Sequence, residues 1–197
     1  MGKRNQIETN SQHLIEMFIS LMHESDRGAV LILTCFLDSQ LEKLHETYIE
    51  LNASSKLGAS LLSYPQPLST FAARIKLAHA YGLIDSDIYT DLEKIREIRN
   101  DCAHSIGSFS FSKASTKAQA LSLKLGHAIV AKRLPELKPI FDAITKDLKV
   151  TNYSADAYPR IHFEFSCQEV GFRILEATTN ILKAEIQKRQ KKQHKAT

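Results

Sequence analysis

Mostly apolar side chains recur at steps of three and four along much of this 197-residue chain, and this spacing constrains the fold most. The longest run begins at Ile161 and ends at Ile186, with the steps 4-3-4-3-4-3-4. An α-helix turns once every 3.6 residues, so such a run lines one face of a helix. Residues 160–166 also alternate as a short strand would, but a period sustained over about seven turns favours a helix.

The same period, together with capping residues, predicts the other helices. Ser25 or Asp26 suits the cap of a long helix, Ser69 that of a shorter one and Asp85 that of a third, because their side-chain oxygens accept hydrogen bonds from free backbone N–H groups. Gly82 suits a helix end. We expect helices over residues 8–24, 26–51, 70–81, 86–104 and 116–133, a kinked helix from 135, and a last helix from 159 to 186.

Composition agrees with a helical fold. The chain has only seven glycines and five prolines, which disfavours all-β sandwiches, collagen-like repeats and glycine-rich phosphate-binding loops. Its length suffices for one domain with its own core, onto which Phe109 and Phe111 should fold back. We predict an all-α fold: a single-domain helical bundle of about six to seven helices over residues 1–197, with a long C-terminal helix and a basic, frayed tail over 187–197.

The formal net charge is +4, and it is concentrated at the C-terminal end. Six basic residues and one acid lie from Lys183 onward, so the rest of the chain is nearly neutral. This distribution argues against a broad nucleic-acid-binding face. No apolar run is long enough to cross a membrane, and the polar N-terminal residues lack the apolar segment of a signal peptide. We therefore expect a cytoplasmic protein without membrane contacts.

Cysteine and histidine spacing predicts no metal and no cofactor. Cys35, Cys102 and Cys167 lie far apart, which fits neither a zinc site nor a disulfide framework and is typical of a reducing compartment. The histidines have no acid or thiol at metal-ligand spacing, and phosphate- and dinucleotide-binding motifs are missing. Cys102 falls on an apolar helix face, so we expect a packed thiol there and not a nucleophile.

Arg99 carries the most information about function. On a helix over 86–104 it lies about 40° from Ile95, inside the apolar stripe. A guanidinium aimed at a core needs an anion, because burying an unpaired charge is costly. One candidate anion is internal, since Asp26 falls on the apolar stripe of its own helix. A bidentate Asp26–Arg99 ion pair would join two helices, and residue types favour this structural interpretation.

The other candidate anion is a phosphate group bound by Arg99. Asn100 and His104 lie beside each other on the adjoining face of the same helix. Asn100 would orient a sugar hydroxyl, and His104 would donate or accept a proton. Such a set, with Arg99, Asn100 and His104 as catalytic residues, would cleave RNA through attack of a 2′-hydroxyl without a metal ion.

Three separated segments resemble the mannitol operon repressor family of bacteria. They are DRGAVLIL at 26–33, PLSTFAARIKLAHAYGLI at 67–84 and YTDLEKIREIRNDCAH at 89–104, in the family's order. The resemblance covers about residues 25–130. It implies an all-helical negative regulator of transcription from sugar-alcohol operons.

The segment RNDCAH at 99–104 also resembles the R-x4-6-H motif of HEPN domains. These are small helical modules, and many are ribonucleases whose two motifs meet across a dimer. The resemblance implies that Arg99 and His104 would be catalytic and Asn100 supportive. Many HEPN-like proteins use the fold without cleaving anything, so the motif leaves both possibilities open.

The expected partner is a protein and not a DNA sequence. The sequence has no helix-turn-helix with a basic recognition helix, because the helix over 86–104 is mixed in charge. A repressor of this kind would act through a protein partner. The heptad-like last helix is long enough either to wrap the bundle or to pair with a second copy, so we expect a partner protein or a homodimer. RNA is the partner under the ribonuclease alternative.

Overall fold

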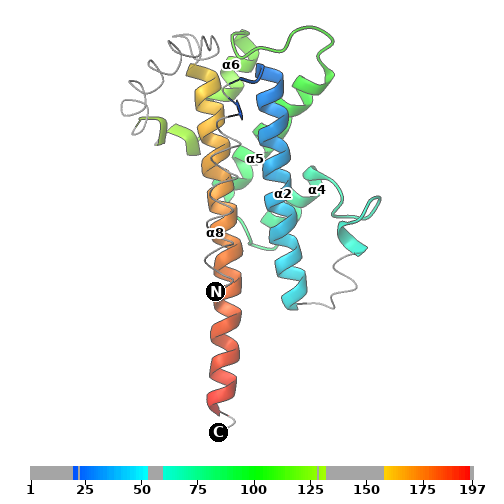
Figure 1. Cartoon of the computed structure of the whole chain (residues 1–197), viewed down its shortest axis with the longest axis vertical. Helices are drawn as coiled ribbons and strands as arrows, with labels where there is room; N and C mark the ends of the chain where they lie inside the picture. The colour runs from blue at the N-terminus through cyan, green and yellow to red at the C-terminus, as the bar shows by residue number, and fades with distance from the viewer. Residues whose placement is uncertain (1–19, 22, 53–59, 128, 132–157, 196–197) are drawn as a thin grey trace.

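The computed structural model describes residues 20–21, 23–52, 60–127, 129–131 and 158–195, and this part of the chain contains α-helices and no β-strand. The helices pack side by side, and one of them extends far beyond the others (Figure 1). The predicted all-α bundle with a long C-terminal helix is thus confirmed. The helix expected from 135 and most of the one over 8–24 lie outside the described residues. No helix within the described ranges is both long and apolar enough to span a bilayer.

Helix α2, Asp26–Asn52, is the central element, as its nearly continuous apolar first half predicts. The Ser25 hydroxyl accepts a hydrogen bond from the Gly28 N–H at 3.0 Å and so caps its first turn. The side chains of Leu33, Leu37, Leu41 and Leu44 are fully buried along one face. In Figure 1, α2 lies alongside α8, Tyr158–Lys195, and the two helices share the most extensive contact in the described bundle.

The predicted bounds of the next two helices are confirmed to within a residue or two. Helix α4, Phe71–Ala80, is capped by the Thr70 side chain and not by Ser69. The chain turns through Gly82, whose φ of 67° lies in the left-handed region that favours glycine. Helix α5, Ser86–His104, begins at Asp85, whose carboxylate accepts hydrogen bonds from the backbone N–H groups of the first turn.

The helix predicted over 116–133 is interrupted. Helix α6, Ala114–Leu121, ends early, and helical backbone resumes at residue 125. The fully buried Asp91 carboxylate of α5 accepts hydrogen bonds from the backbone N–H groups of Lys124 and Leu125, at 3.0 and 2.8 Å. Asp91 thus caps the new helical start from another helix. Phe109 and Phe111, between α5 and α6, are buried in the core as expected.

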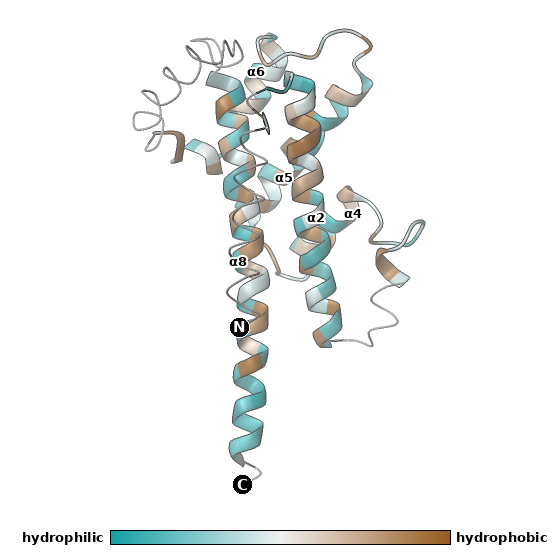
Figure 2. Cartoon of the chain, in the orientation of Figure 1, coloured by the Kyte–Doolittle hydropathy of each residue, from teal (hydrophilic) through white to brown (hydrophobic). Residues whose placement is uncertain are grey.

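Helix α8 is continuous through residues 160–166, so the helix predicted there is confirmed. Its buried face, which includes Phe163, Cys167, Val170 and Ile174, completes the core beside α2. The prediction of a frayed tail is wrong for residues 187–195, which continue the helix. Lysine, arginine and glutamine are good helix formers, and a 2.9 Å ion pair joins Glu185 to Arg189 one turn later. Figure 2 shows this end as strongly polar.

Buried His162 connects α8 to the segment around α6. Its Nδ1 lies 3.1 Å from the Ala120 carbonyl oxygen, and its Nε2 lies 3.2 Å from His127 Nδ1. Burial lowers the pKa of His162 below its ordinary value of 6.5, and the neighbouring His127 lowers it further. The folded protein therefore disfavours the imidazolium form at this position.

Acidification is expected to destabilise the fold through His162. Its pKa is lower in the folded than in the unfolded chain, so the unfolded chain binds more protons as the pH falls below 6.5. The stabilisation by neutral His162 is complete above pH 6.5, and it is lost as the pH falls from 6.5 to the lower pKa of the folded chain. Urea unfolding at about pH 7.5 and about pH 5.5 should show a smaller drop for His162→Gln than for wild type. An equal drop in both proteins would contradict this assignment.

Candidate functional site

The structure corrects the predicted ion pair between Asp26 and Arg99. Arg99 is exposed on α5, and its Nη1 donates a hydrogen bond to Oδ1 of Asn100 at 3.3 Å. Asp26 pairs instead with Arg160 of α8, with Nη1 and Oδ1 3.1 Å apart. The idea that a buried guanidinium needs an anion holds in this fold, but Arg99 is not the buried guanidinium.

The error comes from the position of Arg99 along its helix. Leu92 lies at a similar angle two turns earlier and is fully buried. By residue 99 this side of α5 is no longer covered, so the long arginine side chain extends into solvent. A helical wheel gives the angle of a side chain around the axis, but it does not show where the neighbouring element ends.

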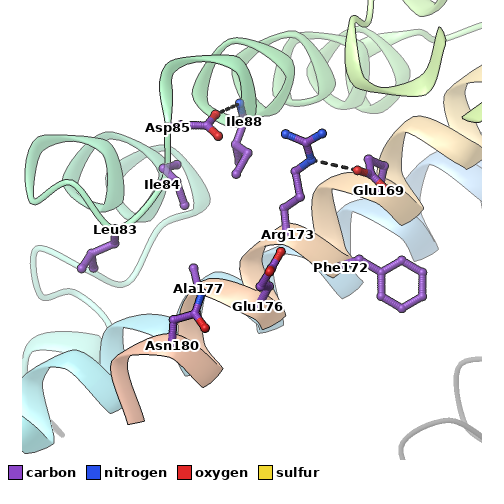
Figure 3. A pocket seen from close by; sticks show the side chains of 10 residues that line it. All are labelled: Leu83, Ile84, Asp85, Ile88, Glu169, Phe172, Arg173, Glu176, Ala177 and Asn180. Carbon is purple, nitrogen blue, oxygen red and sulfur yellow. Dashed lines mark hydrogen bonds and ion pairs between the residues drawn. The ribbon is translucent and has the colours of Figure 1, made fainter. Parts of the chain in front are cut away.

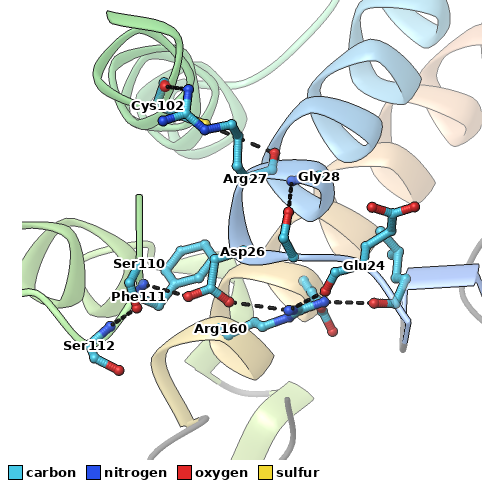
Figure 4. A network of polar contacts seen from close by, with 12 residues as sticks. Glu24, Asp26, Arg27, Gly28, Cys102, Ser110, Phe111, Ser112 and Arg160 are labelled. Carbon is cyan, nitrogen blue, oxygen red and sulfur yellow. Dashed lines mark hydrogen bonds and ion pairs between the residues drawn. The ribbon is translucent and has the colours of Figure 1, made fainter. Parts of the chain in front are cut away.

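Arg160 is the centre of a buried polar network (Figure 4). The residue is 1% exposed. Its guanidinium donates to the carboxylates of Asp26 and Glu164, and to the backbone carbonyl oxygens of Leu21 and Glu24 at 2.6 and 2.8 Å. The second oxygen of Asp26 accepts the Phe111 N–H at 2.9 Å. This network fixes the start of α2 to α8 and to the segment after α5, so its role is structural.

Arg27, the next residue along α2, holds the end of α5. Its guanidinium donates at 2.8 Å to each of the carbonyl oxygens of Cys102, Ser105 and Gly107. Cys102 is fully buried beside it, so the predicted packed thiol is confirmed. Burial raises the pKa of the Cys102 thiol, although the charge of Arg27 partly offsets that effect. Arg27 therefore sets the position of the segment that carries Arg99 and His104.

The three residues of the predicted catalytic set lie in the last two turns of α5. Arg99 and His104 are exposed, and Asn100 is half-buried. The structure brings Arg99 and Asn100 into contact and places His104 in the final turn of the same helix. All three side chains are therefore at least partly accessible to solvent in the single chain.

Helix α8 carries a second apolar face, which points outward. Its exposed apolar side chains are Phe172, Leu175, Leu182 and Ile186, each between 42% and 48% exposed. We call these four residues the outer stripe. The stripe lies about 125° around the helix axis from the buried face that packs on α2. Large exposed apolar side chains gathered on one face mark contact surfaces.

A pocket of about 460 Å³ lies beside the outer stripe, between the start of α5 and the middle of α8 (Figure 3). Its acidic side chains are Asp85, Glu169 and Glu176. Glu169 accepts a hydrogen bond from Arg173 at 2.8 Å, which raises the pKa of the Arg173 guanidinium. Phe172 belongs to both the pocket and the stripe. The two features therefore form one continuous surface, with the apolar stripe on one side and a pocket that holds three acidic side chains and Arg173 on the other.

Sequence reasoning missed the two arginines that are buried among the described residues. Arg160 is one of them, and Arg74 of α4 is the other, paired with Asp38 at 2.7 Å and with Glu42 at 3.3 Å. The signal for Arg160 was an arginine and a glutamate four residues apart in the apolar first turns of the last helix. Its partner Asp26 lies 134 positions away, and no local pattern indicates that contact.

The described residues contain no group of three or more histidine, cysteine or acidic side chains placed to hold a metal ion. In comparisons with known proteins, no family model, no curated protein and no solved structure matches this chain significantly.

Proposed function

We propose that the protein is a bacterial cytoplasmic regulatory protein that acts by binding protein partners and does not read DNA sequence. The outer stripe of α8 is the observation that carries this proposal, because its four side chains leave apolar area in water that a protein partner would bury. The three segments that resemble the mannitol operon repressor family support the regulatory part of the proposal.

The charge of the α4–α5 pair also supports a partner other than DNA. In a helix-turn-helix, the N-terminal residues of the second helix contact the bases. The first turn of α5 instead carries Asp87 after the Asp85 cap. Acidic side chains at that position would face the phosphates, so electrostatic repulsion opposes insertion into the groove.

A substitution in the stripe tests the proposal. Leu182→Glu should abolish retention of a protein partner by the purified full-length chain, because it places a charge within the apolar contact. Ala184→Glu is a matched control, since it adds the same charge to an exposed position on another face of α8. Circular dichroism should show equal helix content in both variants. Equal retention of the partner by both variants, or tight binding to a specific operator DNA in a gel shift, would contradict the proposal.

A metal-independent ribonuclease is the second candidate function. It is favoured by the exposure of Arg99, whose guanidinium is free of the predicted pair with Asp26, and by its contact with Asn100. In this mechanism Arg99 binds the phosphate and the 2′-hydroxyl oxygen attacks phosphorus, so that a 2′,3′-cyclic phosphate forms and the bond to the 5′-oxygen breaks. His104 either takes the 2′-hydroxyl proton or protonates the leaving 5′-oxygen, and water takes or supplies the other proton.

The ribonuclease candidate predicts RNA cleavage in the presence of EDTA. His104→Ala should reduce the rate by about 100-fold or more, because general acid–base catalysis contributes that much. His23→Ala is the control, since His23 is exposed but lies before α2. Cleavage should be followed on denaturing gels with a labelled single-stranded RNA. The candidate fails if wild type leaves the RNA intact or if His104→Ala cleaves as fast as wild type.

A further inference from the structure

The spacing of the outer stripe identifies the kind of partner that fits it. When Thr179 is included with the four residues of the outer stripe, the positions along α8 are separated by steps of 3-4-3-4. They are Phe172, Leu175, Thr179, Leu182 and Ile186. This is the a/d spacing of a two-helix coiled coil, in which each helix buries its stripe against a like stripe. A helix bound in the groove of another protein uses the same spacing, so symmetry and charge decide between the two kinds of partner.

We propose that the outer stripe of α8 pairs with α8 of a second copy of this chain in an antiparallel coiled coil. This inference rests on the proposed function, because it names the partner of the same surface. A two-fold interface is built from one self-complementary patch, and the stripe meets that condition. The two-fold axis lies between residues 180 and 181. An axis at residue 177 would give as many apolar layers, but it would bring the Glu176 side chains of the two copies together.

In this register Leu175 packs against Ile186 of the second copy, and Thr179 packs against Leu182 of the second copy. Each layer occurs twice by symmetry. Glu176 lies beside the stripe and comes opposite Lys183 of the second copy, so one flank of the seam carries two symmetry-related pairs of opposite charges. Glu176 and Lys183 are both exposed in the single chain, and neither forms an ion pair within 4.0 Å with a described residue of the same chain.

The distribution of charge favours the antiparallel over the parallel arrangement. Residues 183–195 carry six basic side chains and one acid on the part of α8 that extends beyond the bundle. An antiparallel pair places this basic end beside Glu176 and beside the Glu169–Arg173 ion pair at the pocket of the second copy. A parallel pair would instead place the two basic ends side by side, which costs energy through like-charge repulsion.

Engineered cysteines test both pairing and direction. In a Cys35→Ser background, which removes the exposed native thiol, we would prepare Leu175→Cys, Ile186→Cys and the double variant. Residues 175 and 186 lie about 16 Å apart within one helix, too far for an internal disulfide. We expect no cross-linked dimer from either single variant alone. The double variant, and a mixture of the two single variants, should cross-link on oxidation.

Two other patterns would overturn the proposal. Cross-linking of each single variant with itself would demonstrate a parallel pair, and no cross-linking of any variant would exclude this register. A charge test is independent of cysteine chemistry. Glu176→Lys should weaken the dimer about tenfold, because two pairs become repulsive, and adding Lys183→Glu should restore it. Failure of the second change to restore the dimer contradicts the antiparallel seam.

Light scattering of the wild-type chain separates this inference from the proposed function. We expect twice the chain mass of 22.2 kDa for wild type and for Ala184→Glu, and the single chain mass for Leu182→Glu. A monomeric wild type whose stripe retains a different protein would overturn the homodimer and leave the proposed function standing. A monomeric wild type that retains no protein, or binds RNA instead through its basic end, would overturn both.

Discussion

Replacing Arg160 with alanine is expected to lower the free energy of unfolding by about 3–5 kcal/mol. The guanidinium is almost completely buried and holds two carboxylates and two backbone carbonyl oxygens. Its removal takes away the cation that pairs with Asp26 and Glu164 in a poorly solvated region, and the cost of leaving buried charge less compensated sets the size of the effect. Urea unfolding followed by circular dichroism measures it directly.

Arg99→Ala is the matched control for this measurement. Arg99 is exposed and donates a long hydrogen bond to its neighbour Asn100, so the expected change is within about 0.5 kcal/mol. The pair of variants distinguishes the observed network from the one that the sequence predicted. Equal destabilisation by both variants, or a larger loss for Arg99→Ala, would show that the assignment of the buried cation is wrong.

Asp91→Ala is expected to cost about 3 kcal/mol. The carboxylate is fully buried and accepts two backbone N–H groups where the helical backbone resumes at residue 125. Alanine leaves both donors without a partner, whereas Asp91→Asn retains one acceptor oxygen and should cost about half as much. Denaturant unfolding of both variants tests this order. A wild-type midpoint for Asp91→Ala would mean that the two N–H groups find other acceptors.

Local signals predicted most of the helical structure. The cap at Asp85 and the turn at Gly82 determine the bounds of α5 and the end of α4, because the chemistry of both positions depends only on adjacent residues. The sustained period of the last helix outweighed the short alternation over 160–166 for the same reason. The break after α6 was missed because its cap is Asp91, a residue of another helix more than thirty positions earlier.

Long-range contacts explain why the site could be predicted only in part. The sequence identified Asp26 as an anion that faces the core, and this is correct, but it could not choose among the chain's arginines. The exposure of Arg99 depends on where the cover over α5 ends, which is a property of the assembled bundle. The heptad of the last helix was visible in the sequence, and the structure adds that the same helix has a separate buried face.

The network around Arg160 also has a consequence for biosynthesis. Arg160 donates to the carbonyl oxygen of Leu21, 139 positions earlier, and its own helix completes the core beside α2. Translation therefore produces α2, with its leucine-rich face, long before the segment that shields it leaves the ribosome. During that interval the nascent chain exposes apolar surface. We therefore expect it to bind chaperones that hold unfinished polypeptides.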